Sequence, residues 1–103
     1  MDAYPGKYYV QGGEEQEATI LILKDRLSIG IRDEHGNPRI VYWPLGQIIR
    51  DNFWKRGMAI VRSSTFPIQT IEVESKEFAD KLENIFKERE RSWLKLLNIL
   101  SRA

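Results

Sequence analysis

Residues 75–100 read SKEFADKLENIFKERERSWLKLLNIL, and this stretch predicts one long amphipathic helix. Apolar residues recur three and four positions apart along its whole length, which is the spacing of one helix face. They are Phe78, Leu82, Ile85, Phe86, Trp93, Leu96, Leu97 and Leu100. The Ser75 hydroxyl can cap the first turn by accepting a hydrogen bond from a backbone N–H that has no partner inside the helix. The helix is therefore expected from about residue 75 to about residue 100.

This helix is too long for the domain that precedes it. At roughly 1.5 Å per residue, about 25 helical residues reach nearly 40 Å, more than a small β domain can cover. We expect the first half of the apolar face to be core and the second half to project. A contiguous exposed apolar surface usually marks an interface, so Trp93, Leu96, Leu97 and Leu100 are the predicted interaction residues. The alternative is a bend in the helix that covers its own second half.

The residues before the helix predict short strands separated by turns. Apolar and β-branched runs alternate with glycine, proline and charged residues. The expected strands are residues 7–10, 18–23, 27–32, 39–43, 51–54, 58–62 and 69–73. Residues 45–50 fit either a helical turn or the entry to a further strand. Period-two alternation places Ser28 and Thr70 on water-facing sides of their strands.

This order of elements predicts the fold class. Strands joined by short turns must pair antiparallel, because parallel pairing needs a crossover of a dozen or more residues. A sheet of six or seven strands with an apolar face must close or fold over, and one helix can cover one open end. We therefore expect a single domain, residues 1–103, with strands over about 6–74. By analogy of fold it is a pleckstrin-homology (PH)-like bent antiparallel barrel of about seven strands, capped by the helix.

Composition excludes several classes of function. The formal net charge is +1, from sixteen bases and fifteen acids, so there is no global field to hold a nucleic acid. The longest aliphatic run, Ile20–Leu23, is far shorter than the roughly 20 residues of a membrane span. The N-terminus lacks the basic-then-apolar order of a secretory signal. The absence of cysteine fits a reducing compartment. A cytoplasmic protein is expected.

The sequence offers no catalytic, cofactor or metal constellation. His35 is the single histidine, and without a second histidine or a cysteine a zinc site would need carboxylates alone. We expect His35 to be a solvated loop residue. Residues 63–65 supply hydroxyls but no neighbouring base to activate them. The chain is therefore expected not to be an enzyme and to need no cofactor.

One predicted hairpin combines basic and aromatic residues, a mixture that can hold an anionic head group or stack an exposed base. Its candidate anion-contact residues are Arg50, Trp54, Lys55, Arg56 and Arg62. The other interpretation is a plain solvated hairpin. The first hairpin loop, residues 14–17, is acidic and would repel the phosphates of an inositide lipid.

Three motifs resemble the small N-terminal domain that precedes many bacterial M48-family metallopeptidase domains. They are Gly6-Lys7-Tyr8-Tyr9, Leu27-Ser28-Ile29 and Trp43-Pro44-Leu45-Gly46-Gln47-Ile48, within residues 4–74. The resemblance implies a cytoplasmic PH-like module ahead of a membrane span and a protease. The zinc-binding His-Glu-x-x-His motif is missing, since Gly36 follows His35, so this stretch is not itself the peptidase.

Together these observations predict a non-catalytic PH-like interaction module, a fragment of a larger bacterial membrane protein. Its partner would be another protein, its own downstream domain or a second copy that forms a homo-oligomer. The alternative function is a peripheral membrane-binding domain at the inner face of the membrane. In that case the basic hairpin and the C-terminal helix would both lie on anionic lipid.

Overall fold

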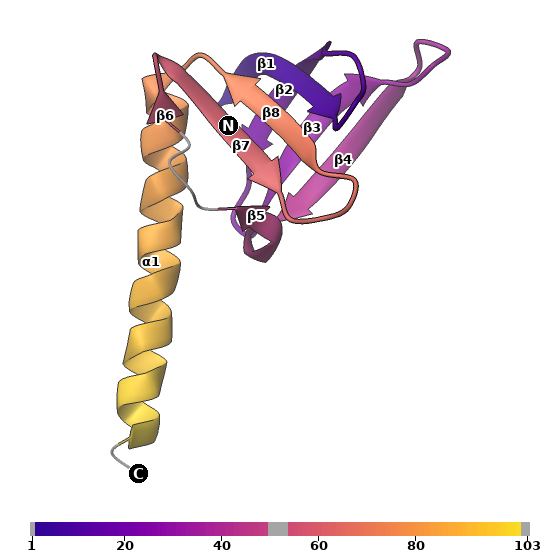
Figure 1. Ribbon diagram of the computed structural model, residues 1–103. Helices are drawn as coiled ribbons and strands as arrows, with labels where there is room; N and C mark the ends of the chain where they lie inside the picture. The colour runs from indigo at the N-terminus through magenta and orange to yellow at the C-terminus, as the bar shows by residue number, and fades with distance from the viewer. Residues whose placement is uncertain (1, 50–53, 102–103) are drawn as a thin grey trace.

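The computed structural model describes residues 2–49 and 54–101, apart from the side chains of residues 92, 93, 100 and 101. Its strands are β1 (Ala3–Val10), β2 (Gln16–Ile22), β3 (Arg26–Arg32), β4 (Pro38–Pro44), β5 (Ile48–Ile49), β6 (Trp54–Lys55), β7 (Met58–Ser63) and β8 (Gln69–Val73). A 3₁₀ turn, η1 (Leu45–Gln47), joins β4 to β5, and α1 (Lys76–Ser101) follows β8. The mainly β class with one C-terminal helix is confirmed (Figure 1).

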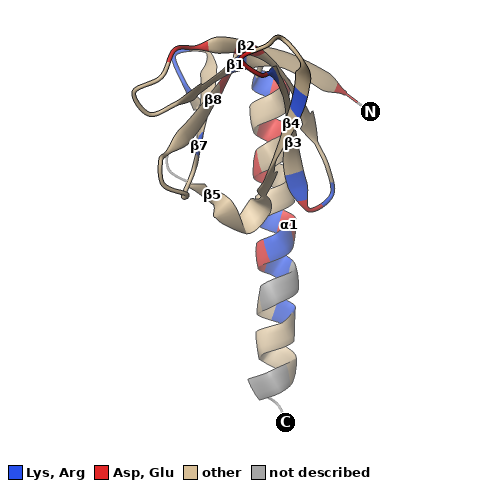
Figure 2. Cartoon of the chain, turned by 90° about the vertical axis from the view of Figure 1, so that its right-hand side faces the viewer, with Lys and Arg blue, Asp and Glu red and all other residues tan. Residues whose placement is uncertain are grey.

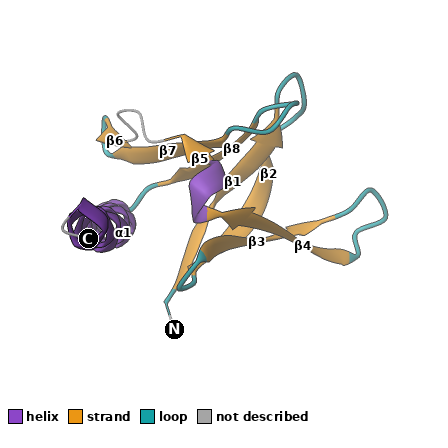
Figure 3. Ribbon diagram, turned by 90° about the horizontal axis from the view of Figure 1, so that it is seen from below, coloured by secondary structure: helices purple, strands orange, loops and turns teal. Residues whose placement is uncertain are grey.

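All described strands belong to one antiparallel sheet in the order β4-β3-β2-β1-β8-β7-β5, with β6 paired to β7. The sheet is curled, and β1 pairs with both β2 and β8 where its two halves join. Figure 3 shows the two halves facing each other as an open V with η1 between them. No described pairing joins β4 to β5. The expected bent barrel is therefore an incompletely closed one, open along this side.

The strand β1 begins at Ala3, earlier than the predicted start near residue 7. Pro5 lies inside it, opposite Thr19 of β2, whereas β8 pairs only with residues 7–10. Proline is tolerated there because the strand has one neighbour at this position and the missing N–H is not needed. The next residue is Gly6. A side chain does not fit there, because a Cβ would lie 2.6 Å from the Glu72 carbonyl oxygen.

The helix covers the inner face of the sheet with its first three turns. The backbone N–H of Phe78 donates to the Ser75 hydroxyl (3.1 Å), so the predicted cap is confirmed. Phe78, Leu82 and Phe86 are buried in the core, with Ile85 packed beside them. The Phe78 ring meets Tyr4 of β1 edge to face, with 5.2 Å between ring centroids. The prediction that this half of the apolar face is core is confirmed.

A polar contact inside the barrel connects the two halves of the sheet. The side-chain oxygen of Gln69, at the start of β8, accepts hydrogen bonds from the Tyr8 hydroxyl (2.9 Å) and from Trp43 Nε1 (3.1 Å). Trp43 lies at the end of β4 and is fully buried. Because β4 and β8 are separated by three strands in the sheet order, this contact crosses the interior and holds the two halves of the sheet together.

Two residues predicted to face water are buried. Ser28 lies between Leu21 of β2 and Tyr42 of β4 in the strand register. Thr70 lies between Tyr9 of β1 and Arg62 of β7. Each is small and sits on an interior strand between longer side chains, which cover it on the outer face. The alternation of apolar and polar residues placed Ser28 and Thr70 on the correct side of the sheet, but it did not predict that their side chains are buried.

The structure resolves one segment that the sequence left open and confirms one predicted hairpin. Residues 45–49 form η1 and then the short strand β5. The predicted hairpin at residues 55–57 is confirmed between β6 and β7, with positive φ at Arg56 (54°) and Gly57 (78°), as a tight two-residue hairpin turn requires. Residues 51–53 of the predicted strand lie outside the described residues.

Gly6→Ala should destabilise the barrel by about 1–3 kcal/mol, because the added methyl group overlaps backbone that cannot move aside. The matched control is Gly30→Ala in β3, where the nearest atom to an added Cβ is the Thr19 carbonyl oxygen at an ordinary 3.6 Å. Urea unfolding monitored by tryptophan fluorescence measures both. Equal stabilities of the two variants would contradict the close approach at Gly6.

Gln69→Leu should lower the free energy of unfolding by about 2 kcal/mol, because it leaves the buried Trp43 N–H without an acceptor. In a Trp43→Phe background the same change should cost about 1 kcal/mol less, since that donor is then absent. A double-mutant cycle from urea unfolding measures the difference. Additive losses would show that the contact across the barrel contributes nothing.

Candidate functional site

Beyond Phe86 the helix leaves the barrel and runs alone, in the segment we call the overhang (residues 87–101; Figure 1). It gives the molecule extents of 56 × 27 × 26 Å. Four apolar side chains on it are exposed: Leu94 by 58%, Leu96 by 47%, Leu97 by 42% and Ile99 by 67%. The helix does not bend back over them, so the projection expected from its length is observed.

The overhang continues the helix face that plugs the barrel. Leu97 lies three turns after Phe86, and Leu96 lies about four turns after Leu82, at roughly 3.6 residues per turn. The two leucines therefore face the side on which the barrel stands. Two of the predicted interaction residues, Trp93 and Leu100, are helical in backbone. Their side chains lie outside the described residues.

A concave corner results from this arrangement, which we call the corner. One wall is the apolar face of the overhang, and the other is the end of the barrel from which α1 projects. In Figure 1 this end carries η1 and the connection between β7 and β8. Phe66 lies in that connection and is 91% exposed.

The charge on α1 is mixed in its first turns and basic toward its C-terminal end. Its first turns carry both signs, paired as Lys76–Asp80 (3.1 Å), Glu77–Lys81 (3.1 Å) and Glu83–Lys87 (3.6 Å). In the latter two pairs an acid precedes a base by four residues, the favourable order on a helix. After Glu90 the charged residues of the described part are Arg91 and Lys95, both basic. Figure 2 shows mixed blue and red on the upper helix, and blue and tan on the described residues toward its C-terminus.

The predicted anion-contact residues do not form one cluster in the described structure. Lys55 and Arg56 are exposed at the tip of the β6–β7 hairpin, whereas Arg62 lies on β7 beside Thr70. Trp54 is half-buried, and Lys76 of α1 places its Nζ 5.2 Å from the ring centroid. Arg50 lies outside the described residues. The hairpin thus packs against the start of the helix, at the opposite end from the overhang.

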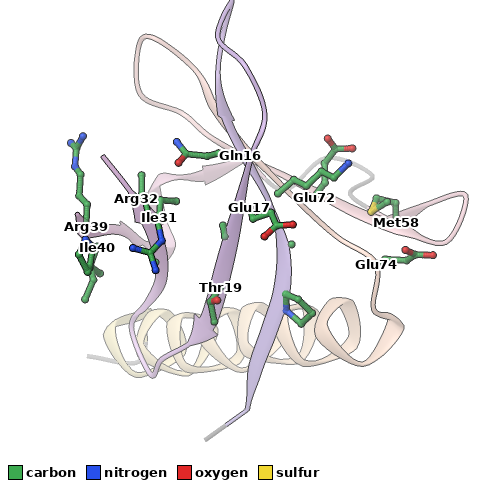
Figure 4. A pocket seen from close by; sticks show the side chains of 16 residues that line it. Gln16, Glu17, Thr19, Ile31, Arg32, Arg39, Ile40, Met58, Glu72 and Glu74 are labelled. Carbon is green, nitrogen blue, oxygen red and sulfur yellow. The ribbon is translucent and has the colours of Figure 1, made fainter. Parts of the chain in front are cut away.

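A cavity of about 950 Å³ lies on the outer face of the sheet (Figure 4). Its lining includes Lys7, Glu17, Thr19, Arg32, Ile40 and Glu72. Charges of both signs alternate across it, and Lys7 is already paired with Glu15 (3.5 Å). The sequence analysis did not identify this cavity. It is lined by residues of several strands that are distant in the sequence, so it could have been predicted only if the pairing of those strands had been known.

Side chains that could have contributed to catalysis or metal binding instead make hydrogen bonds to neighbouring residues. The Asp33 carboxylate accepts hydrogen bonds from the backbone N–H groups of Asn37 and His35 (both 2.9 Å). The bond from Asn37 is the main cause of its lowered pKa. His35 itself is an exposed turn residue, as expected. Ser63 ends β7, is fully buried, and shares a 2.5 Å hydroxyl hydrogen bond with Thr65. Ser63 is therefore a buried strand residue rather than an accessible nucleophile.

Comparison of the chain with protein-family models, with curated proteins and with solved structures found no match. Within residues 2–49 and 54–101, no group of three or more histidine, cysteine, aspartate or glutamate side chains could hold a metal ion. In the same residues, no helix has both the length and the apolar content of a membrane span.

The two halves of the apolar face should respond differently to the same substitution. Leu82→Ala, inside the barrel, should cost about 2–5 kcal/mol of unfolding free energy through lost burial and a cavity. Leu97→Ala, on the overhang, should change it by less than about 0.5 kcal/mol. Chemical unfolding at low protein concentration measures both. A large loss at Leu97 would mean that the overhang packs on its own barrel in solution.

Proposed function

We propose that this chain is a non-enzymatic interaction module of PH-like architecture that docks a partner protein in the corner. The observation that carries the proposal is the pair of exposed leucines, Leu96 and Leu97, on the side of the overhang that faces the barrel. Fully burying an exposed leucine contributes about 1.5–3 kcal/mol. For these two half-exposed side chains the total available to a partner in the corner is on the order of 1.5–3 kcal/mol.

The shape of the corner favours a protein over a lipid surface. Leu96 and Leu97 face the side on which the barrel stands, and the barrel is far wider than the roughly 10–12 Å of a helix with its side chains. A flat bilayer lying along this face would meet the barrel before the leucines. A folded partner can instead enter the corner and contact both the overhang and the end of the barrel.

The charges of the overhang lie away from the corner. At roughly 3.6 residues per turn, Arg91 and Lys95 are on the side of α1 opposite Leu82, and no acid follows Glu90 in the sequence. The wall that the overhang contributes to the corner is therefore mainly apolar. The partner we infer is a folded protein with an apolar ridge that fits this corner.

The peripheral membrane alternative has weaker support. It needs the basic hairpin and the C-terminal helix on one bilayer. The hairpin contacts α1 at Lys76, and at roughly 1.5 Å per residue Leu97 lies about 30 Å further along the helix axis. Trp54 is also half-buried and engaged with Lys76, which reduces the aromatic surface that a membrane could take up.

The proposal is tested with a photo-crosslinking amino acid placed at Leu97, and as control at Asn84, in cells that make the protein. Asn84 is exposed on the opposite face of α1. Crosslinks from position 97 should converge on one protein. Purified, it should bind the wild-type chain, and Leu97→Glu should weaken binding at least tenfold, because a buried carboxylate replaces a buried leucine.

The matched control for that titration is Asn84→Glu, which adds the same charge away from the corner and should leave binding unchanged. Three results would contradict the proposal. They are crosslinks only within the protein's own polypeptide, crosslinks only to a second copy, and salt-sensitive binding to anionic vesicles that Leu97→Glu abolishes. Each would name a different occupant for the overhang.

A further inference from the structure

The strand β4 ends the sheet on one side and is paired only with β3 in the described structure. Its sequence is Pro38-Arg39-Ile40-Val41-Tyr42-Trp43-Pro44. Unpaired strand edges invite pairing with another chain, and proteins commonly block them with charges, bulges or a covering segment. Here prolines stand at the two ends of the strand, and the residues between them are mostly apolar.

The hairpin geometry shows which backbone groups face the free edge. At the turn, the Asp33 N–H donates to the Asn37 carbonyl (2.9 Å), and at the other end the Leu45 N–H donates to the Asp25 carbonyl (3.1 Å). Hydrogen-bonded pairs alternate along an antiparallel ladder, so Arg39, Val41 and Trp43 bond to β3. The N–H and C=O groups of Ile40 and Tyr42 therefore point to the free edge.

The side chains of the same two residues are exposed on the outer face of the sheet, Ile40 by 57% and Tyr42 by 49%. The Arg26 guanidinium lies 4.6 Å from the Tyr42 ring centroid and covers one side of the ring. Open backbone groups and exposed apolar side chains thus coincide at two positions separated by Val41.

The pattern of β4 is symmetric about Val41. An antiparallel second copy centred there would place Ile40 opposite Tyr42, Arg39 opposite Trp43 and Pro38 opposite Pro44. Aromatic and β-branched residues make favourable cross-strand pairs, and no like charges meet. The prolines fall where the pairing ends and no donor is needed. A two-fold axis through Val41 makes this contact self-complementary and closed.

We propose that β4 is a homodimer edge, at which two copies pair antiparallel about Val41 and join their sheets into one. The bonds formed are the backbone hydrogen bonds of Ile40 and Tyr42 with Tyr42 and Ile40 of the second copy. The pairing is independent of the overhang and uses a different side of the molecule. A short edge contact of this kind gives a weak dimer, one formed at high micromolar concentration.

The test uses sedimentation equilibrium in a Leu97→Glu background, so that association through the overhang does not contribute. Two double variants carry the same number of new charges. Ile40→Lys with Tyr42→Lys places Lys opposite Lys across the two-fold axis. Ile40→Lys with Tyr42→Glu places Lys opposite Glu. The second should dimerise at least tenfold more tightly than the first.

A mixture supplies the control for effects within one chain, such as a contact between Arg26 and the new carboxylate. The Lys/Lys variant and an Ile40→Glu, Tyr42→Glu variant should each be monomeric alone and should form a heterodimer when mixed. Circular dichroism checks that every variant is folded. A background protein that stays monomeric at millimolar concentration would overturn the proposal, and so would equal association of the Lys/Lys and Lys/Glu variants.

Discussion

The structure depends on the packing of one helix into a sheet that curls without closing. The curl turns the apolar sides of β1, β2, β3, β7 and β8 toward a common interior, but no described pairing joins β4 to β5. Phe78, Leu82 and Phe86 fill that interior from one side, with Phe78 against Tyr4. Without them the inner face would meet water, so the barrel and the first half of α1 form one cooperative unit.

The second half of α1 follows from the size of that unit. Three helical turns are enough to cover the interior of the barrel. Residues 87–101 contain no proline or glycine that would end the helix there. Its apolar spacing persists, so the side chains that would be core in a larger domain stand in solvent. At the opposite end, Ser75 and the ion pairs of the first turns fix where the helix begins.

Local rules were enough to predict most of the elements. The spacing of apolar residues located α1, the hydroxyl of Ser75 located its cap, and glycine at position 57 located a hairpin. Features set by pairing between distant strands could not be predicted. Three such features depend on which strands become neighbours. They are the contact of Gln69 with Tyr8 and Trp43, the burial of Thr70, and the cavity on the outer face of the sheet. The free edge of β4 is of the same kind, because its significance lies in the order of the sheet.

The contrast between Leu82 and Leu97 bears on function. They occupy one helix face, yet Leu82 is buried and Leu97 is 42% exposed. A leucine inside the barrel stabilises the fold, whereas an exposed one contributes almost nothing to it and favours aggregation. Exposed leucines scattered singly need no explanation, but the four exposed apolar side chains of the overhang lie within two turns and form a patch. Folding stability gives no reason for such a patch, and burial by a partner does.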